Sequence, residues 1–465
     1  MALCQSGREI TGGQEMIDDK TLLKFDGPVP RYTSYPTAPH FTDAIGSQTY
    51  HQWLGEIPGH EPLSLYFHVP FCDTLCWFCG CQMTVVNRYE PVASYLDILA
   101  IEIDRVAEAL HSRRPVRHLH WGGGSPTIIA SDDFKKVMAR IGQHFDILDD
   151  AEIAIEIDPR GFTAVHARAL ADAGVNRASI GIQDFDPAVQ AAVNRLQPFD
   201  ETRAVVESLR EHDISGISFD LLYGLPHQNV QTMISTVDLA VSLDPARFSL
   251  FGYAHVPWMR PHQALIPDIL LPDGRARLAL YRAAAGRLAE HGYVPIGIDH
   301  FARPDDAMAR AVDDGRLRRN FQGYTTDEAD TLIGFGASAI GSLPQGYVQN
   351  SPLVPDYRSA IEGGELAIAK GISIDDGDRL RRAAIERLMC DLCVDLAAEA
   401  RRYDLDVALF RPSLENLMPL QSEGLVSVEG NIVTVPEAAR LSVRVVCAAF
   451  DSYLGQGPGQ HSRAV

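Results

Sequence analysis

The chain has 465 residues, of which 46% are apolar and 22% charged, and its formal charge at neutral pH is −20. This length exceeds a single simple core, so we expect one large domain and a smaller one. The negative charge argues against a nucleic-acid surface, and no apolar run approaches the roughly 20 residues of a membrane-spanning helix.

The N-terminus has no basic segment followed by an apolar one, so no secretory signal is apparent. We therefore expect a cytoplasmic protein whose cysteines stay reduced.

Residues 1–45 are expected to form an extended arm, because the stretch 28–41 holds four prolines and little periodicity. A regular alternation of β-rich apolar runs and amphipathic helical patterns follows. The expected strands are 63–69, 116–121, 152–158, 177–183, 216–224 and 247–254. The expected helices are 95–110, 133–145, 164–174, 201–213 and 230–243. Such repeats predict parallel βαβ units, and six units are fewer than the eight of a closed barrel, so we predict an α/β fold with a partial, TIM-like (βα)6 barrel.

The rest of the chain is less regular. Residues 260–355 show no clear period, whereas 378–400 is expected to be one long helix. Two short alternating runs about Gly430 and Asn431 predict a hairpin. These features predict a smaller, mainly helical, winged-helix-like domain at the C-terminus. We place the three parts at 1–45 (arm), 46–365 (catalytic domain) and 366–465 (C-terminal domain).

Four of the eight cysteines fall within ten residues, in the stretch HVPFCDTLCWFCGCQM: Cys72, Cys76, Cys79 and Cys81. In a reduced protein this clustering indicates a metal, redox or catalytic site. Zinc sites usually pair two cysteines with a second pair farther along, and none follows nearby, so zinc is disfavoured. Three thiolates on one short loop suit an iron–sulfur cube, whose fourth iron is then open to a small molecule.

The loop follows the first expected strand directly, at the end where βα folds build active sites. A purely structural cluster is the alternative, although such clusters normally use four thiolates. Cys81 is either a fourth ligand or a free thiol beside the substrate. Cys390 and Cys393 form a C-x-x-C inside the helical pattern 378–400, where we expect buried helix cysteines rather than a redox pair.

The spacing C-x3-C-x-F-C, made by Cys72, Cys76, Phe78 and Cys79, resembles that of the radical S-adenosylmethionine enzymes. Further segments narrow the resemblance to the oxygen-independent coproporphyrinogen III oxidases, also called coproporphyrinogen dehydrogenases. They are YFHVPFCDTLCWFCGC, HWGGGSPT, IEIDPR, IGIQDFD, VNRLQ, FDLLYGLPHQ, FGYAHVP, DHFARPDD and RNFQGYTT. This resemblance spans nearly the whole chain.

The resemblance implies an enzyme of heme biosynthesis. It would convert two propionates of coproporphyrinogen III to the vinyl groups of protoporphyrinogen IX without oxygen, through a 5′-deoxyadenosyl radical. The implied cofactors are one [4Fe–4S] cluster and two molecules of S-adenosylmethionine. An electron donor and an electron acceptor, which the sequence does not identify, would complete the reaction, and we expect a monomer.

The resemblance also assigns site residues. Cys72, Cys76 and Cys79 would bind the cluster. Contacts to the first S-adenosylmethionine would come from Tyr66, Phe78, Glu156 and Ile340, and contacts to the second from Gln183, Arg195, Asp220 and Ala254. The run Gly122, Gly123, Gly124 and Ser125 would line these sites. The candidate catalytic residues are Tyr66, His68 and Cys81.

Ordinary structural roles compete with several of these assignments. A glycine triplet is usually a turn, although after a buried strand it lets a ligand approach the backbone. Glu156 lies between two isoleucines, so its carboxylate would be buried and need a partner. Gln183, Arg195 and Asp220 could equally make salt bridges or caps. A strand histidine such as His68 is more often structural.

The chain has five lysines and thirty-six arginines. Arginine binds carboxylates bidentately, so a few arginines could hold a substrate with four carboxylates despite the acidic total. Our candidates are Arg31, Arg303 and Arg319, and the N-terminal arm could close over the site. A heme-binding chaperone of the same fold is the alternative function, against which Cys81 argues. A zinc-structured interaction protein is a third.

Overall fold

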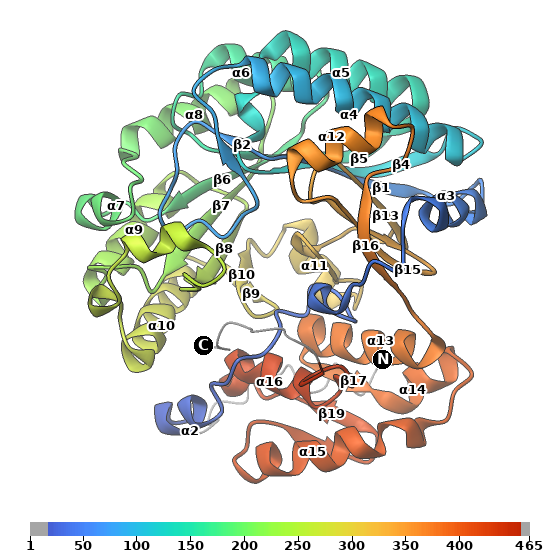
Figure 1. The fold of residues 1–465 in the computed structure, drawn as a ribbon. Coiled ribbons are helices and arrows are strands. Elements are labelled where there is room, and N and C mark those ends of the chain that lie inside the picture. Colours follow the sequence, from blue (N-terminus) through green and yellow to red (C-terminus); the bar gives the residue numbers. More distant parts are fainter. Residues whose placement is uncertain (1–16, 457–465) are drawn as a thin grey trace.

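The computed structural model describes residues 17–456. Cys4, the start of the expected arm and residues 457–465 of the expected C-terminal domain lie outside the described residues. Figure 1 shows a large α/β domain with the helices of the C-terminal part grouped below it. Within the described residues no helix is long and apolar enough to cross a membrane.

A twelve-stranded sheet forms the large domain, in the order β16-β15-β14-β13-β1-β4-β5-β6-β7-β8-β10-β9. Its central strands are β1 (Leu63–Val69), β4 (Pro115–Gly123), β5 (Asp146–Ile157), β6 (Arg177–Gln183), β7 (Gly216–Tyr223) and β8 (Arg247–Gly252). Each is parallel to the next. These are the six strands expected, and β1 and β6 have the expected bounds. The predicted α/β class with six parallel barrel strands is confirmed.

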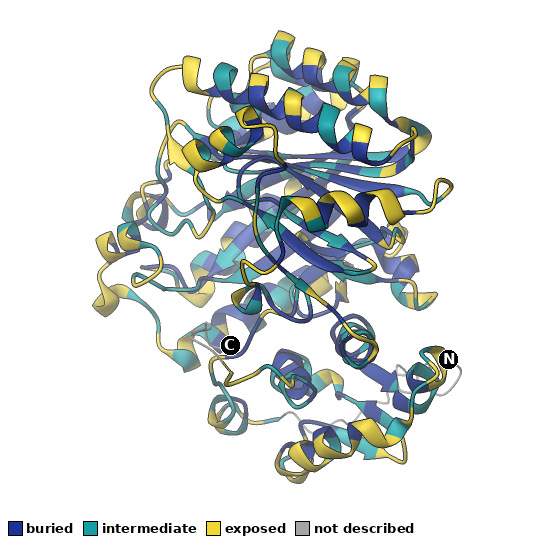
Figure 2. Ribbon diagram, turned by 45° about the vertical axis from the view of Figure 1, so that its right-hand side comes forward, coloured by how far each residue is buried: buried dark blue, intermediate teal, exposed yellow. Residues whose placement is uncertain are grey.

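The expected helices cover the outer face of these strands. They are α4 (Glu90–Ala109), α5 (Ser131–His144), α6 (Ala164–Asp172), α8 (Phe199–Glu211) and α9 (Val230–Ser242), with a short α7 (Pro187–Ala192) before α8. In α5 the buried residues are Phe134, Val137, Met138 and Ile141, which recur at three- and four-residue steps. Figure 2 shows the same division, with exposed outer faces on the helices and a buried sheet.

The segment without clear period, 260–355, extends the sheet on both edges. It contains α10 (Gly274–Glu290), β9 (Val294–Ile296), β10 (His300–Ala302), α11 (Ala307–Asp313), β11 (Arg318–Asn320), β12 (Gly323–Thr325), β13 (Thr331–Phe335), β14 (Ile340–Leu343) and β15 (Gly346–Asn350). After it come α12 (Val354–Glu362) and β16 (Ile368–Ser373). β13 is a seventh parallel strand beside β1. Strands of three to five residues are too short to show a two-residue alternation, which explains why this segment shows no clear period.

The C-terminal part differs from expectation at its first helix. α13 (Asp376–Asp391) ends where Leu392 adopts a left-handed conformation, with φ of 57°. β17 (Cys393–Asp395) and α14 (Leu396–Arg402) follow, so the single helix expected over 378–400 is wrong. Cys390 is buried at the end of α13, but Cys393 lies in a strand rather than in a helix.

The expected hairpin is confirmed. β18 (Ser427–Glu429) and β19 (Ile432–Thr434) pair antiparallel about Gly430, and β17 adds a third strand. With α15 (Arg411–Ser422) and α16 (Val443–Ala448) they form a mainly helical unit with a small sheet.

The N-terminal segment runs between the two parts. α2 (Asp19–Lys24) precedes the proline-rich stretch, and α3 (Ser47–Glu56) follows it. Tyr32 donates to Asp451 at 3.1 Å, and the hydroxyl of Tyr35 lies 2.9 Å from that of Ser452. The arm therefore already packs on the C-terminal part in this structure, and Figure 1 shows it crossing between the two.

Candidate functional site

The cysteine loop leaves the carboxyl end of β1 and is closed by a short parallel pair, β2 (Phe71–Cys72) and β3 (Thr84–Val85). Four side chains from distant segments donate to its backbone carbonyls at 2.8 to 2.9 Å: Asn194 to Leu75, Gln263 to Phe78, His262 to Cys79, and Arg260 to Gly80. Unpaired loop carbonyls would be costly beside a buried site, so these bonds fix the loop in one conformation.

Two guanidinium groups approach the sulfur of Cys76, which is 6% exposed. Arg160 donates to it at 3.3 Å and Arg195 at 3.4 Å. Both arginines also bind Asp158, at 2.5 and 3.1 Å. Burial raises the pKa of Asp158, but the two arginines outweigh it and hold the pKa below its usual range. The network presents positive charge to the position where a thiolate ligand would carry negative charge.

The three predicted cluster ligands, Cys72, Cys76 and Cys79, lie close enough for their charges to affect one another. Burial, followed by the neighbouring Cys79 and Cys76, raises the pKa of the Cys72 thiol to about 12. Within residues 17–456 no three His, Cys, Asp or Glu side chains converge on a single metal ion. An iron–sulfur cube spreads its thiolates over different irons, so three crowded thiols beside two arginines fit a cluster better than a lone cation.

Cys81 is exposed and lies next to Cys79. A hydrogen bond between the two thiols raises the pKa of Cys81 and lowers that of Cys79. The structure therefore places Cys81 at the open end of the loop, within reach of the ligand position of Cys79.

The glycine triplet packs against the predicted first site. A Cβ at Gly122 would lie 2.8 Å from Oε1 of Glu156 and 3.1 Å from the ring of Tyr66. A Cβ at Gly123, whose φ is +116°, would lie 2.7 Å from the ring of His68. These positions accept only glycine, because any side chain would fill the space between the backbone and the three polar residues.

Glu156 accepts hydrogen bonds from the backbone N–H of Gly123 at 3.1 Å and from Nε2 of His120 at 3.4 Å. Burial raises its pKa, but His120 and this N–H outweigh the effect and hold the pKa below its usual range. The ring of His120 also stacks on Tyr66, with centroids 5.9 Å apart. Sequence reasoning missed His120, although its place two residues before the glycine triplet was a usable signal.

His68 is held on both sides. Nε2 lies 3.0 Å from the carbonyl of Gln82, which can only accept, so Nδ1 accepts from the hydroxyl of Tyr66 at 3.0 Å. Burial lowers the pKa of His68, which agrees with a neutral ring. Both ring nitrogens are thus occupied within the protein.

Gln183 and Arg195 come together at the end of β6. Gln183 has a left-handed φ of 68°, and the amide of its side chain lies 2.8 Å from where a Cβ on Gly181 would be. Arg195 donates to the carbonyl of Gly181 at 2.6 Å and to Gln197 at 3.0 Å. With its bonds to Cys76 and Asp158, four of the five guanidinium N–H groups are used, which leaves one for a ligand.

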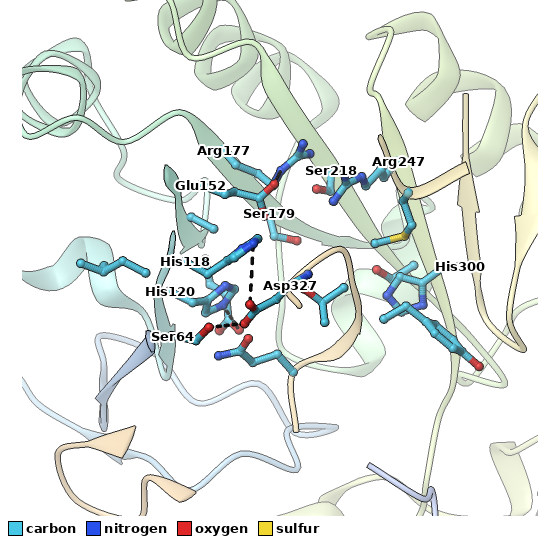
Figure 3. Close-up of a pocket in the computed structure, with 18 of the residues that line it drawn as sticks. Ser64, His118, His120, Glu152, Arg177, Ser179, Ser218, Arg247, His300 and Asp327 are labelled. Atoms are coloured by element: carbon cyan, nitrogen blue, oxygen red, sulfur yellow. Dashed lines mark hydrogen bonds and ion pairs between the residues drawn. The ribbon is translucent and has the colours of Figure 1, made fainter. Parts of the chain in front are cut away.

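Asp220 lines a cavity of about 190 Å³ in the barrel interior, together with Glu156. It accepts from Ser179 at 3.1 Å, and burial raises its pKa. Figure 3 shows Arg177 and Arg247 on one side of this cavity and His118 and Asp327 on the other. The interior is therefore polar, unlike the layers of branched apolar side chains that fill a closed TIM barrel.

The remaining predicted residues are more dispersed. Ala254 lines a second cavity of about 690 Å³ beyond the end of β8. Ile340, in β14, packs on an apolar cluster that includes Phe41 and Tyr347, and β13 separates its strand from that of Tyr66. Phe78 packs against another apolar cluster around Val189 and Tyr253. The side chain of Ser125 faces a third cavity that also contains Arg160 and Asp73.

Of the three arginines considered for substrate carboxylates, Arg31 and Arg319 line the cavity of about 690 Å³. Arg303 does not: it is ion-paired with Asp244 and donates to the carbonyl of Pro245 at 3.2 Å. The motif of Arg303 therefore leads away from this cavity, and its role toward the substrate stays a prediction. Sequence reasoning also missed the residues that hold the loop and the thiol of Cys76, which come from separate segments: Arg160, Asn194, Arg260, His262 and Gln263.

Two family models match the chain: the radical SAM superfamily over residues 66–240, and the HemN C-terminal domain over residues 374–442. A curated oxygen-independent coproporphyrinogen III oxidase from Bradyrhizobium diazoefficiens is 51% identical, over 94% of this chain and 97% of its own. The chain belongs to the family of oxygen-independent coproporphyrinogen III oxidases. The Escherichia coli member is 39% identical, over 95% of this chain and 97% of its own.

A solved structure, described as coproporphyrinogen III oxidase (HemN) from Escherichia coli and as a radical SAM enzyme, superposes with a TM-score of 0.89. It is 38% identical and covers 95% of this chain and 100% of its own. Membership of the oxidase family makes this chain a radical S-adenosylmethionine oxidoreductase, a class that uses a [4Fe–4S] cluster and S-adenosylmethionine. The relatives named here support the oxidase rather than the chaperone alternative.

Proposed function

We propose that this chain catalyses the anaerobic oxidative decarboxylation of two propionates of coproporphyrinogen III, giving the vinyl groups of protoporphyrinogen IX. The observation that carries the proposal is the cysteine loop at the end of β1, with Cys76 facing two guanidinium groups. The names of relatives that match nearly the full chain agree with it. The proposed location is the cytoplasm, and the proposed oligomeric state is a monomer.

Cys72, Cys76 and Cys79 would hold the cluster, and Arg160 and Arg195 would offset the negative charge of the Cys76 thiolate. When bound, the cluster and S-adenosylmethionine supply a carbon radical able to take hydrogen from an unactivated C–H bond. The protein orients the reactants and excludes water. The carbonyl bonds from Arg260, His262 and Gln263 serve this role, because they hold the loop against the barrel mouth.

The glycine triplet with Glu156 and Tyr66 would hold one S-adenosylmethionine, because a buried carboxylate there can accept from an ammonium or ribose group. Gln183, Asp220 and Ala254 would hold a second molecule, with Arg195 contributing its one unused N–H. Equilibrium binding by the anaerobic holoenzyme should give two molecules per chain. One molecule per chain would remove the second site from the proposal.

The candidate catalytic residues divide into two kinds. Tyr66 donates to His68, and His68 donates to a backbone carbonyl, so this pair positions the ligand beside the glycines. Cys81 is the free thiol of the proposal: Cys81→Ser should retain the iron content of the wild type and lose turnover. Loss of iron in that variant would instead make Cys81 a ligand.

The function is tested by incubating the anaerobic protein with S-adenosylmethionine, a reductant, coproporphyrinogen III and a one-electron acceptor that takes the electron released when each propionate loses carbon dioxide. The expected result is the divinyl product with about two deoxyadenosines per porphyrin, one for each propionate. Tight hemin binding without product would refute the proposed function and favour the chaperone.

A further inference from the structure

The cavity of about 690 Å³ lies where four parts of the chain meet. Its lining includes Arg31 of the arm, Phe251 of β8 and Ala254 just after it, Arg277 of α10, and Arg444 of α16. Its volume falls in the range of roughly 300–1,000 Å³ that is typical of small-molecule sites. Since Ala254 is a proposed contact of the second S-adenosylmethionine, the cavity opens beside the reaction centre.

Aromatic side chains form much of the apolar wall. They are Tyr223, Phe251, Tyr253, Trp258 and Tyr281. Trp258 is 58% exposed, and the nearby Met259 is 57% exposed. An exposed tryptophan and methionine at the mouth of a cavity suit a flat, largely apolar ligand that enters from solvent.

The guanidinium of Arg319 indicates most clearly that this cavity binds an anion. Its Nε and Nη1 atoms are buried and have no hydrogen-bond partner within the described residues. Nη2 donates to the backbone carbonyl of Arg31 at 3.3 Å, and the guanidinium lies 4.3 Å above the ring of Tyr324. Burying a guanidinium whose two nitrogen atoms lack hydrogen-bond acceptors costs free energy, unless a bound ligand supplies the acceptors.

Three further cations share this space. Arg444 donates to the carbonyls of Pro30 and Val29, which fixes it under the arm. Burial, followed by the charges of Arg31 and Arg319, lowers the pKa of Arg444 to about 10, so these three guanidinium groups repel one another. The like charges therefore gather at a cost that an anionic ligand would offset.

Arg277 of α10 completes the set. Its guanidinium lies 5.4 Å above the ring of Tyr223. A Cβ at Gly252 would lie 2.9 Å from its Nη2 atom, and a Cβ at Gly224 would overlap Nη1. Two glycines thus make room for this side chain at the ends of β7 and β8.

Three carboxylates also line the cavity: Asp26, Asp273 and Asp299. Asp273 caps α10 by accepting from the N–H of Ala276 at 2.8 Å, and Asp299 binds Nδ1 of His300 at 2.7 Å. Asp273 is thus engaged as a helix cap, whereas the negative charge of Asp299 also acts to raise the pKa of Arg319 and Arg444, against the effect of their burial, and so offsets part of the charge of the four arginines.

We propose that Arg277, Arg319 and Arg444, with Arg31 of the arm, bind the carboxylates of the tetrapyrrole substrate while its rings lie on the aromatic wall. The proposal rests on the proposed function, and it names which arginines of this chain recognise a tetracarboxylate. The arm is part of the site, because Arg31 and the carbonyls of Pro30 and Val29 position the cationic face.

The test is a binding measurement that needs no turnover. The anaerobic holoenzyme is titrated with coproporphyrin III, the stable fluorescent porphyrin with four carboxylates, and with mesoporphyrin IX, which has two. Arg319→Gln and Arg277→Gln should each weaken coproporphyrin binding by about tenfold or more, the loss expected for one charged hydrogen bond. Binding of the dicarboxylate should weaken less.

Arg275→Gln is the matched control, because Arg275 lies on the same helix as Arg277 but is exposed and outside the cavity. Iron content is measured in every variant to exclude misfolding. The inference is overturned if both variants bind coproporphyrin as the wild type does, or lose both porphyrins equally. The proposed function fails separately, if the wild type binds coproporphyrin but forms no vinyl product from the porphyrinogen.

Discussion

Replacing Arg195 by methionine tests the charge network beneath the cysteine loop. The side chain of Arg195 is 8% exposed and binds Asp158, the carbonyl of Gly181, Gln197 and the sulfur of Cys76. Methionine has a similar length and keeps the apolar contacts, but it makes none of these bonds. The variant therefore separates the charge from the packing.

The expected loss of unfolding free energy is about 3 kcal/mol, because breaking a buried ion pair typically costs 3–5 kcal/mol and Asp158 keeps Arg160 as a partner. Arg160→Met is the matched comparison. Its side chain is 20% exposed and shares the same carboxylate and the same sulfur, so we expect a loss of about 1 kcal/mol.

Urea unfolding of the anaerobic proteins measures both losses. Each loss is the shift of the urea midpoint multiplied by the m-value of the wild type. A redox titration adds a second readout, since removing either donor to Cys76 should make the cluster potential more negative. Equal losses for the two variants, or a loss under about 1 kcal/mol for Arg195→Met, would refute the reasoning from burial.

Two further predictions concern carboxylates. Glu156→Gln keeps the shape of the side chain but removes its charge, so the KM for S-adenosylmethionine should rise about tenfold. Glu152→Gln is the control: Glu152 lies on the same strand but is paired with Arg177, so this variant should leave that KM unchanged. An unchanged KM in the first variant would remove Glu156 from the binding site. Glu102, 2% exposed, has a pKa raised by burial from 4.5 to about 7. The carboxyl group of Glu102 therefore stays protonated to higher pH in the folded state than in the unfolded state. The free energy of unfolding should fall by up to about 3 kcal/mol as the pH rises from about 4.5 to 7. Glu102→Gln should flatten that slope of midpoint against pH, and an unaltered slope would contradict the assigned pKa.

The barrel strands were predictable because their signals are local. β1 is a short apolar run buried on both faces, and β6 alternates between half-buried and buried residues, and turn residues flank both strands. The end of α13 was not predictable, because the left-handed Leu392 has no glycine or asparagine to mark it. β9 to β15 were missed because they have only three to five residues, too few to show an alternation, even though β9 and β10, β11 and β12, and β14 and β15 pair with their neighbours in sequence.

The site residues likewise fall into those that a local sequence pattern reveals and those that only the fold brings together. The cysteine spacing and the glycine triplet are contiguous, so the sequence shows them directly. Arg260, Gln263 and Arg277 have no pattern around them, and only the tertiary fold brings them to the loop or the cavity. Arg303 was chosen from its motif alone, and the fold turns it toward Asp244.

The central claim is that three thiols of one loop hold a [4Fe–4S] cluster, and iron and sulfide analysis tests it most directly. Anaerobically reconstituted wild type should contain about four irons and four sulfides per chain. The triple variant Cys72→Ala, Cys76→Ala, Cys79→Ala should contain almost none while its far-UV spectrum stays that of the wild type. Equal iron in both proteins, or none in the wild type, would contradict the account.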